Sequence, residues 1–212
     1  MKLLNKLPKS NPKLHVDFIK HGWIPMKEPK NLISAILLSI PLMIVASMIS
    51  IGVINIFSSI SLRDFGFTSA GLSITINLSV ILGIVCLLII HELLHLIFIP
   101  NFMKSEKTAV GLTLFGGFVM TEEEISKSRY LFITIAPFMI LSIIFPLIFS
   151  AFGLLTTTLK FLIILNSLGS SVDLLNLLLI MKQVPKNATL KCNGSNTYWK
   201  NAQTEQKGKD NA

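Results

Sequence analysis

The sequence predicts an all-α membrane protein that folds as a bundle of four transmembrane helices. Apolar residues make up 51% of the 212-residue chain, and the mean hydropathy is +0.67. Only 14% of the residues are charged, whereas soluble domains carry about 25%. The charged residues gather in polar blocks that separate four long apolar stretches. These observations argue against a soluble enzyme, a disordered chain and a nucleic-acid-binding domain.

Each apolar stretch reaches the length of about 20 residues that a helix needs to cross a bilayer. The alternation of polar and apolar blocks divides the chain into three parts. A basic N-terminal segment (1–31) precedes a membrane domain (32–181), and a polar tail (182–212) follows it. The four predicted spans cover residues 32–57, 73–99, 130–152 and 159–181.

The positions of lysine and arginine predict the orientation of these helices, because cytoplasmic segments of membrane proteins are enriched in both residues. With four spans, both terminal segments and the connection between the second and third spans lie on the same side. That side carries 17 of the 19 basic residues. The chain is therefore expected in the cell membrane with both termini cytoplasmic. Its net charge of +8 then reflects topology and attraction to anionic lipid, not nucleic-acid binding. The oligomeric state is not predicted.

Two acidic residues, Glu92 and Asp173, lie inside the predicted spans, where an ionisable side chain is energetically costly and marks a functional site. Glu92 belongs to an H-E-x-x-H pattern with His91 and His95. Residues four apart share one helix face, so both imidazoles can bind one metal ion. Glu92 can then take a proton from water on the metal and return it to a leaving amine. The alternative is a polar cluster that joins helices through hydrogen bonds.

A catalytic zinc ion needs three protein ligands and one position open to water, so a third ligand must come from another segment. Asp173 is the better candidate. The second and fourth spans run in the same direction. His91 lies nine residues before Pro100 and Asp173 nine residues before Lys182, and these two residues mark the cytoplasmic ends of the spans. His91 and Asp173 therefore both lie ~13 Å from the cytoplasmic end. His15 and His21, in the N-terminal segment, are expected to be solvated or interfacial.

Asn166 lies seven residues before Asp173, which places the two residues within ~20° of each other around a helix. Gly169 and Ser170 between them would allow the second span to approach closely. Asn166 has two open interpretations. It can donate a hydrogen bond to the oxyanion that develops during hydrolysis, or it can serve helix packing.

Segment 108–120 is too short to span the membrane, and its residues alternate in polarity and size before a Gly116-Gly117 turn. This pattern predicts a short β-hairpin that dips into the membrane between the second and third helices. Unpaired strand edges are tolerated there only against protein or a water-filled cavity. Such an edge would hold an extended peptide by strand addition. A plain surface loop is the alternative.

Residues 73–199 resemble the site-2 protease class of intramembrane zinc metallopeptidases. They are more similar still to a family of small bacterial four-span zincin membrane proteins. Val172 and Leu174 flank Asp173 where site-2 proteases usually carry proline and glycine, which favours the smaller family. The resemblance rests on the H-E-x-x-H helix, the segment 166–173, the Gly-Gly-aromatic segment 111–119 and residues 185–188.

The resemblance implies a membrane-embedded zinc metalloprotease that hydrolyses transmembrane or membrane-adjacent peptides. His91, His95 and Asp173 would bind Zn²⁺, and Glu92 and Asn166 would be the catalytic residues. The expected partners are membrane lipid and the peptide substrate. The alternative is a non-catalytic metal-binding membrane protein, such as a transporter, an immunity protein or an assembly factor. A transporter should place ionisable residues in both halves of the membrane, whereas here they cluster in the inner half, which favours the enzyme.

Overall fold

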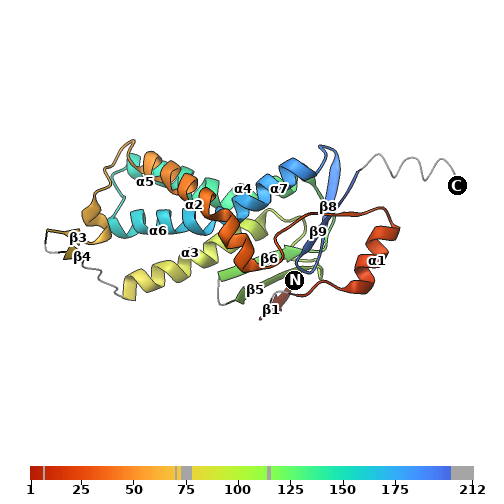
Figure 1. The fold of residues 1–212 in the computed structure, drawn as a ribbon. Coiled ribbons are helices and arrows are strands. Elements are labelled where there is room, and N and C mark those ends of the chain that lie inside the picture. Colours follow the sequence, from red (N-terminus) through yellow and green to blue (C-terminus); the bar gives the residue numbers. More distant parts are fainter. Residues whose placement is uncertain (7, 70, 73–77, 114–115, 202–212) are drawn as a thin grey trace. The chain divides into compact units, whose positions relative to one another are not determined.

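The computed structural model groups the chain into two units (Figure 1). The sheet unit comprises Met1–Lys30, Glu92–Thr134 and Asn176–Ala212. The helical unit comprises Asn31–His91 and Ile135–Leu175. The residues that the structure describes are 1–6, 8–69, 71–72, 78–113 and 116–201.

Four long helices contain most of the apolar residues, and each is long and apolar enough to cross a membrane. The prediction of four such helices is therefore confirmed, with bounds that differ by a few residues from those expected. The third passes through a π-helical turn, Ile140–Ile144 (η2), and the fourth is divided near Ser170. The helices are α2 (Leu32–Ile54), α3 (Leu78–Ile97), α4 (Lys127–Met139) continuing into α5 (Phe145–Ala151), and α6 (Thr157–Gly169) followed by α7 (Ser171–Gln183).

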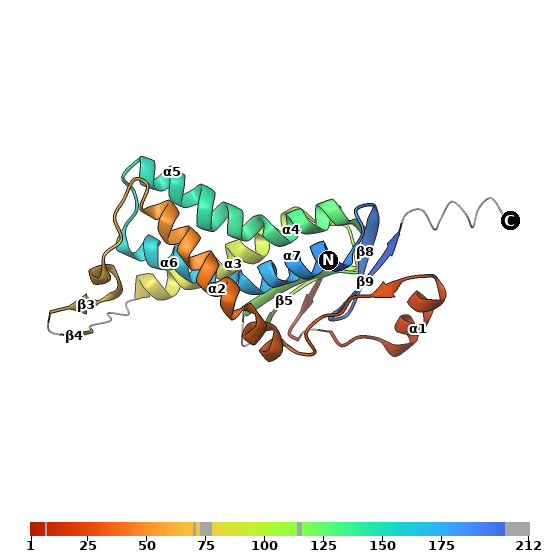
Figure 2. The ribbon, with the colours of Figure 1, turned by 45° about the horizontal axis from the view of Figure 1, so that its top comes forward.

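The helical unit buries small polar side chains between its helices. Within it α2 packs along α6 and against α5 (Figure 2). Ser50 on α2 and Ser167 on α6 are fully buried, with their hydroxyl oxygens 2.5 Å apart. The large apolar side chains of α2 face outward instead, and Leu37 and Met48 are 60% and 66% exposed. Helices of water-soluble proteins show the opposite arrangement, with apolar side chains buried and polar side chains exposed.

A short segment of the helical unit connects α2 to α3. It contains the 3₁₀ turn Leu62–Phe65 (η1) and an antiparallel pair of two-residue strands, Phe67–Thr68 (β3) and Gly71–Leu72 (β4). The Asp64 carboxylate of η1 lies 3.6 Å from Nζ of Lys160 on α6. This ion pair fastens the connection to the end of α6.

The sheet unit shows that the prediction of an all-α chain is wrong. Its β-strands come from four separate parts of the sequence and form two sheets. A nine-residue helix, Pro12–Lys20 (α1), belongs to the same unit. The first sheet has the order Lys2–Leu4 (β1), Thr108–Thr113 (β5) and Gly116–Thr121 (β6); the second has the order Ile24–Pro25 (β2), Asn196–Asn201 (β9), Ala188–Asn193 (β8) and Ile125–Ser126 (β7).

The second sheet includes part of the C-terminal segment that the sequence analysis treated as a polar tail. Leu190 on β8 and Tyr198 on β9 are fully buried. The Tyr198 ring meets Phe18 of α1 edge-on, at a centroid distance of 5.1 Å. A half-buried strand needs an apolar residue only at alternate positions. Its average composition therefore remains polar even though it contributes to a core.

The predicted β-hairpin is present as β5 and β6, which pair antiparallel from Thr108↔Thr121 to Thr113↔Gly116. The predicted position of the turn is wrong, because Gly116 and Gly117 are the first residues of β6. The connection falls at residues 114–115, outside the described residues. Strand β1 pairs in parallel along the other side of β5, which the sequence analysis did not predict.

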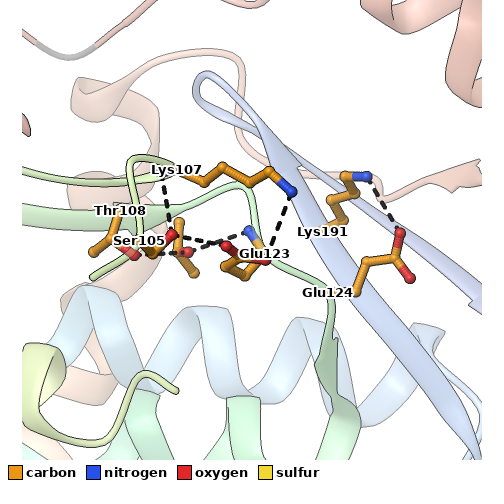
Figure 3. Close-up of polar contacts among 7 residues, drawn as sticks. Ser105, Lys107, Thr108, Glu123, Glu124 and Lys191 are labelled. Atoms are coloured by element: carbon orange, nitrogen blue, oxygen red, sulfur yellow. Dashed lines mark hydrogen bonds and ion pairs between the residues drawn. The ribbon is translucent and has the colours of Figure 1, made fainter. Parts of the chain in front are cut away.

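Polar contacts fasten the open end of this hairpin (Figure 3). The buried hydroxyls of Thr108 and Thr121 lie 3.1 Å apart. Ser105 donates to the Glu123 carboxylate at 2.7 Å, and Lys107 lies 3.8 Å from the same carboxylate. A slip of one residue in strand register would move every side chain to the opposite face of the sheet. These contacts oppose such a slip and so fix the position of Gly117 on β6.

Candidate metal centre

Helix α3 carries the H-E-x-x-H residues near its C-terminal end. The helix is continuous from Leu78 to Ile97, so His91 and His95 lie one turn apart on the same face. Ten of the thirteen preceding residues of the helix are leucine, isoleucine or valine. The helix thus presents two imidazoles at the spacing that one metal ion requires.

His91 contacts two residues of the helical unit through its two ring nitrogens. Its Nδ1 lies 2.9 Å from Oδ1 of Asn166, and its Nε2 lies 3.3 Å from Oδ2 of Asp173. A carboxamide oxygen can only accept, so Nδ1 carries the proton in the neutral ring. Nε2 then presents a lone pair to a carboxylate. Two acceptors facing each other at this distance require a cation or a second proton between them.

His95 shows the same arrangement within the sheet unit. Its Nδ1 lies 2.8 Å from the carbonyl oxygen of Ile133 on α4. The carbonyl accepts, so Nδ1 of His95 carries the proton and Nε2 is the nitrogen with a lone pair. Metal-ligating histidines characteristically donate their other ring N–H to a carbonyl or carboxylate, which fixes the tautomer. Both histidines of the motif satisfy this condition.

Glu92 lies directly against the backbone of strand β6. A Cβ atom added to Gly117 would collide with the Glu92 side chain, at 2.7 Å from Cδ and 2.9 Å from Oε1. Only glycine leaves room for this approach. The sequence analysis assigned Gly117 to a turn, so this contact with the proposed general base was missed. The signal in the sequence was the Gly-Gly pair itself, because glycine within a strand can mark a close backbone approach as well as a turn.

Asn166 is 3% exposed and lies among the helices of its unit. Its Oδ1 accepts from His91, and its Nδ2 donates to Oγ of Ser142 at 2.8 Å and to the Pro137 carbonyl at 3.3 Å. These contacts fit the helix-packing interpretation. The oxyanion role of Asn166 stays a prediction.

A family model described as "putative zincin peptidase" matches residues 84–189, which is half of the chain. The chain belongs to this family. The matched region contains the whole H-E-x-x-H motif, the β5–β6 hairpin and the segment from Asn166 to Asp173. No curated protein and no solved structure matches the chain.

Membership of a zincin family implies zinc and peptidase activity, and the residues of this chain fit that metal. Two imidazole Nε2 atoms and one carboxylate form a donor set of the kind found at catalytic zinc sites, which keep one position open. A metal site with softer thiolate ligands would instead require cysteine side chains, and neither cysteine belongs to the group of His91, His95 and Asp173. The two cysteines of the chain are Cys86, which is exposed, and Cys192, which is buried in the sheet unit where burial raises the thiol pKa to about 11.

The other two histidines of this zincin-family chain have partners within the sheet unit. Nδ1 of His15 lies 2.7 Å from the hydroxyl of buried Tyr198. His21 follows α1, where it is 67% exposed and lies 3.3 Å from Asp17. The expectation of a solvated residue therefore describes His21 well, whereas His15 belongs partly to the core of the second sheet.

Proposed function

We propose that this zincin-family chain is a membrane-embedded zinc metalloprotease of the site-2 protease type. His91, His95 and Asp173 bind one zinc ion in this proposal. The observation that carries it is the pair of contacts at His91: a proton fixed on Nδ1 by Asn166, and a lone pair on Nε2 directed at the Asp173 carboxylate. His95, one turn along α3 and with the same tautomer, supplies the third ligand.

When bound at these residues, zinc would polarise the scissile carbonyl and make its water ligand more acidic. Glu92 follows His91 on α3, and its side chain lies against Gly117 of β6. In the proposed reaction its carboxylate takes a proton from the attacking water and later gives it to the leaving amine. The backbone at Gly117 holds the carboxylate in place by leaving it no room to move toward β6.

The membrane setting of the proposal is supported by the exposed apolar side chains of the long helices. Leu78 and Leu82 on α3 are 69% and 58% exposed, and large exposed apolar surfaces mark contact with lipid or with other proteins. The distribution of basic residues orients both termini toward the cytoplasm. The substrate is then a transmembrane or membrane-adjacent peptide, held in extended form beside the β5–β6 hairpin.

Zinc content separates a metal site from a simple ion pair between His91 and Asp173. The full-length protein, purified in detergent, should contain about one zinc ion per chain by elemental analysis. His91→Ala and Asp173→Ala should each lower this content strongly, because each removes one of three ligands. His21→Ala is the matched control and should keep its zinc. A His91→Ala protein with undiminished zinc would contradict the proposal.

Proteolysis is tested separately with Glu92→Gln, which keeps shape and hydrogen bonding but cannot accept a proton at neutral pH. The variant should keep its zinc and fall by about 10²–10⁴-fold in the rate of membrane-peptide cleavage. The measurement is a comparison of newly formed peptide termini in membranes that contain either protein. Zinc retention together with unchanged peptide termini would favour the non-catalytic metal-binding alternative. Loss of zinc would instead make Glu92 a ligand.

A further inference from the structure

The helical unit contains a connected set of buried hydrogen bonds that ends at His91. Asn166 Nδ2 donates to Ser142 Oγ at 2.8 Å, and Ser167 Oγ donates to the same oxygen at 2.9 Å. Ser167 in turn lies 2.5 Å from Ser50 Oγ. The three serines are fully buried and Asn166 is 3% exposed. The set therefore joins α2, η2 and α6 to the imidazole on α3.

Ser142 occupies a special position in this set because it lies in the π-helical turn Ile140–Ile144. A π turn inserts one residue beyond the normal helical spacing, and such turns often occur at functional sites. Pro137, three residues before the turn, has no N–H to continue a regular ladder. Its carbonyl oxygen accepts from Asn166 at 3.3 Å. The irregular turn thus brings a hydroxyl and a backbone carbonyl to the same carboxamide.

The Pro137 carbonyl and the Ser142 hydroxyl face the Nδ2 atom of Asn166. The Pro137 carbonyl can only accept, at 3.3 Å, and Ser142 Oγ accepts at the shorter distance of 2.8 Å, while Ser142 itself lies 3.5 Å from the Ile163 carbonyl as a donor. With Nδ2 on this side, Oδ1 of Asn166 faces His91. If the carboxamide turned over, an N–H would meet Nδ1 of His91. The proton of the imidazole would then move to Nε2, the nitrogen that faces Asp173.

We propose that Ser142, held inward by the π-helical turn, is a positioning residue for the metal ligand His91 and acts through Asn166. The proposal rests on the proposed function, in which Nε2 of His91 binds zinc. Partners of this kind, one step removed from the ligand, typically contribute 10–100-fold to metal affinity. The arrangement also gives a role to the buried serines that three helices of the unit contribute.

Two measurements test the role of Ser142. Nitrogen-15 NMR of histidine in the metal-free full-length protein reports the tautomer of His91, and the chain has only four histidines to assign. Competition with a chelator of known affinity reports zinc binding. Ser142→Ala should give His91 a mixed tautomer and weaken zinc binding by about 10–100-fold. Ser142→Thr keeps the hydroxyl and should restore both.

Ser150→Ala is the matched control. Ser150 is buried on the same long helix, and its hydroxyl has no hydrogen-bond partner among the described residues. This variant should leave the His91 tautomer and zinc affinity unchanged. The proposal is overturned if Ser142→Ala keeps the Nδ1–H tautomer and full affinity, or if Ser150→Ala loses as much. If the wild-type protein binds no zinc, the proposed function fails, but the tautomer of metal-free His91 still decides the role of Ser142.

Discussion

The helical unit and the sheet unit differ in where they place their large apolar side chains. In the helical unit Ser50, Ser142 and Asn166 lie inside, while many leucine, isoleucine and methionine side chains are exposed. In the sheet unit Leu190 and Tyr198 form the core, and lysines lie at the surface. A hydroxyl gains most from burial where the alternative environment cannot hydrogen-bond to it. A leucine gains most where the alternative is water.

This difference indicates that the two units suit different surroundings, lipid for the helical unit and water for the two sheets. The outer surface of the helical unit suits lipid and its interior supplies hydrogen bonds, so its polar residues are available to orient His91. The two β-sheets of the sheet unit bury apolar side chains as a water-soluble domain does, and strand β6 of this unit places its backbone against Glu92. On this view the helical unit orients His91, whereas the sheet unit orients His95 and holds Glu92.

The largest expected effect comes from truncating the same residue type on the two sides of this comparison. Leu190→Ala removes a fully buried side chain from the sheet unit and should lower the free energy of unfolding by about 2–5 kcal/mol. Leu37→Ala, at a position 60% exposed on α2, should change it by less than about 0.5 kcal/mol in detergent. Urea unfolding followed by fluorescence reports the sheet unit, because both tryptophans, Trp23 and Trp199, lie there.

Circular dichroism of the same samples provides the control for the helical unit. In the Leu190→Ala protein the fluorescence transition should occur at a lower urea concentration than in the wild type, while the helical signal persists at that concentration. If the two signals move together, the units unfold as one body and the comparison of two separate cores is wrong.

A smaller effect, on activity and not on stability, is expected where strand β6 contacts Glu92. Gly117→Ala places a methyl group against the Glu92 carboxylate and should displace it by several tenths of an ångström. Misplacement of a reacting group by about 1 Å can reduce the rate by ~10², so peptide cleavage should fall by about 10–100-fold with zinc retained. Gly169→Ala, where an added Cβ meets nothing within 4 Å, is the control. Equal activity of the two variants would show that β6 does not position Glu92.

The sequence predicts well those features that a continuous stretch of residues specifies. Four apolar stretches of helical length predict the four long helices, and the spacing of His91 and His95 predicts a shared helix face. Hydropathy and helical periodicity are local properties, so each can be evaluated without knowledge of the rest of the fold. The proximity of His91 and Asp173, whose Nε2 and Oδ2 atoms lie 3.3 Å apart, is a long-range feature that the sequence predicted, because the two residues have equal depth in the predicted spans.

The remaining features depend on register between distant segments. Strand β1 pairs with β5 across more than a hundred residues of sequence, and no local pattern specifies that partner. Ser142 is one small residue in an apolar helix, and its importance follows from a π turn that periodicity does not reveal. The strands of the C-terminal segment were predictable in principle, since buried Leu190 and Cys192 alternate with Lys191.

The smallest expected effect concerns a carboxyl group in the sheet unit. Burial raises the pKa of Glu28, although its carboxylate accepts the backbone N–H of Thr197 at 2.9 Å. Because the pKa in the folded state is raised, the neutral form is favoured there. The stabilising contribution is complete below the unfolded-state pKa and is lost as the pH rises through the folded-state pKa. At neutral pH the charge on Glu28 therefore destabilises the sheet unit.

Glu28→Gln keeps an acceptor for Thr197 and removes the charge, so it should stabilise the sheet unit by no more than about 1 kcal/mol at pH 7. The gain should vanish about one pH unit below the unfolded-state pKa of about 4.3, where the wild-type carboxyl is neutral in both states. Urea unfolding followed by tryptophan fluorescence across this pH range measures the difference. Glu106→Gln, at an exposed position, should show no such trend. A loss of stability in Glu28→Gln at pH 7 would mean that the charged carboxylate itself stabilises the sheet unit. The sheet unit would then contain a stabilising buried polar group, as the helical unit does with its serines.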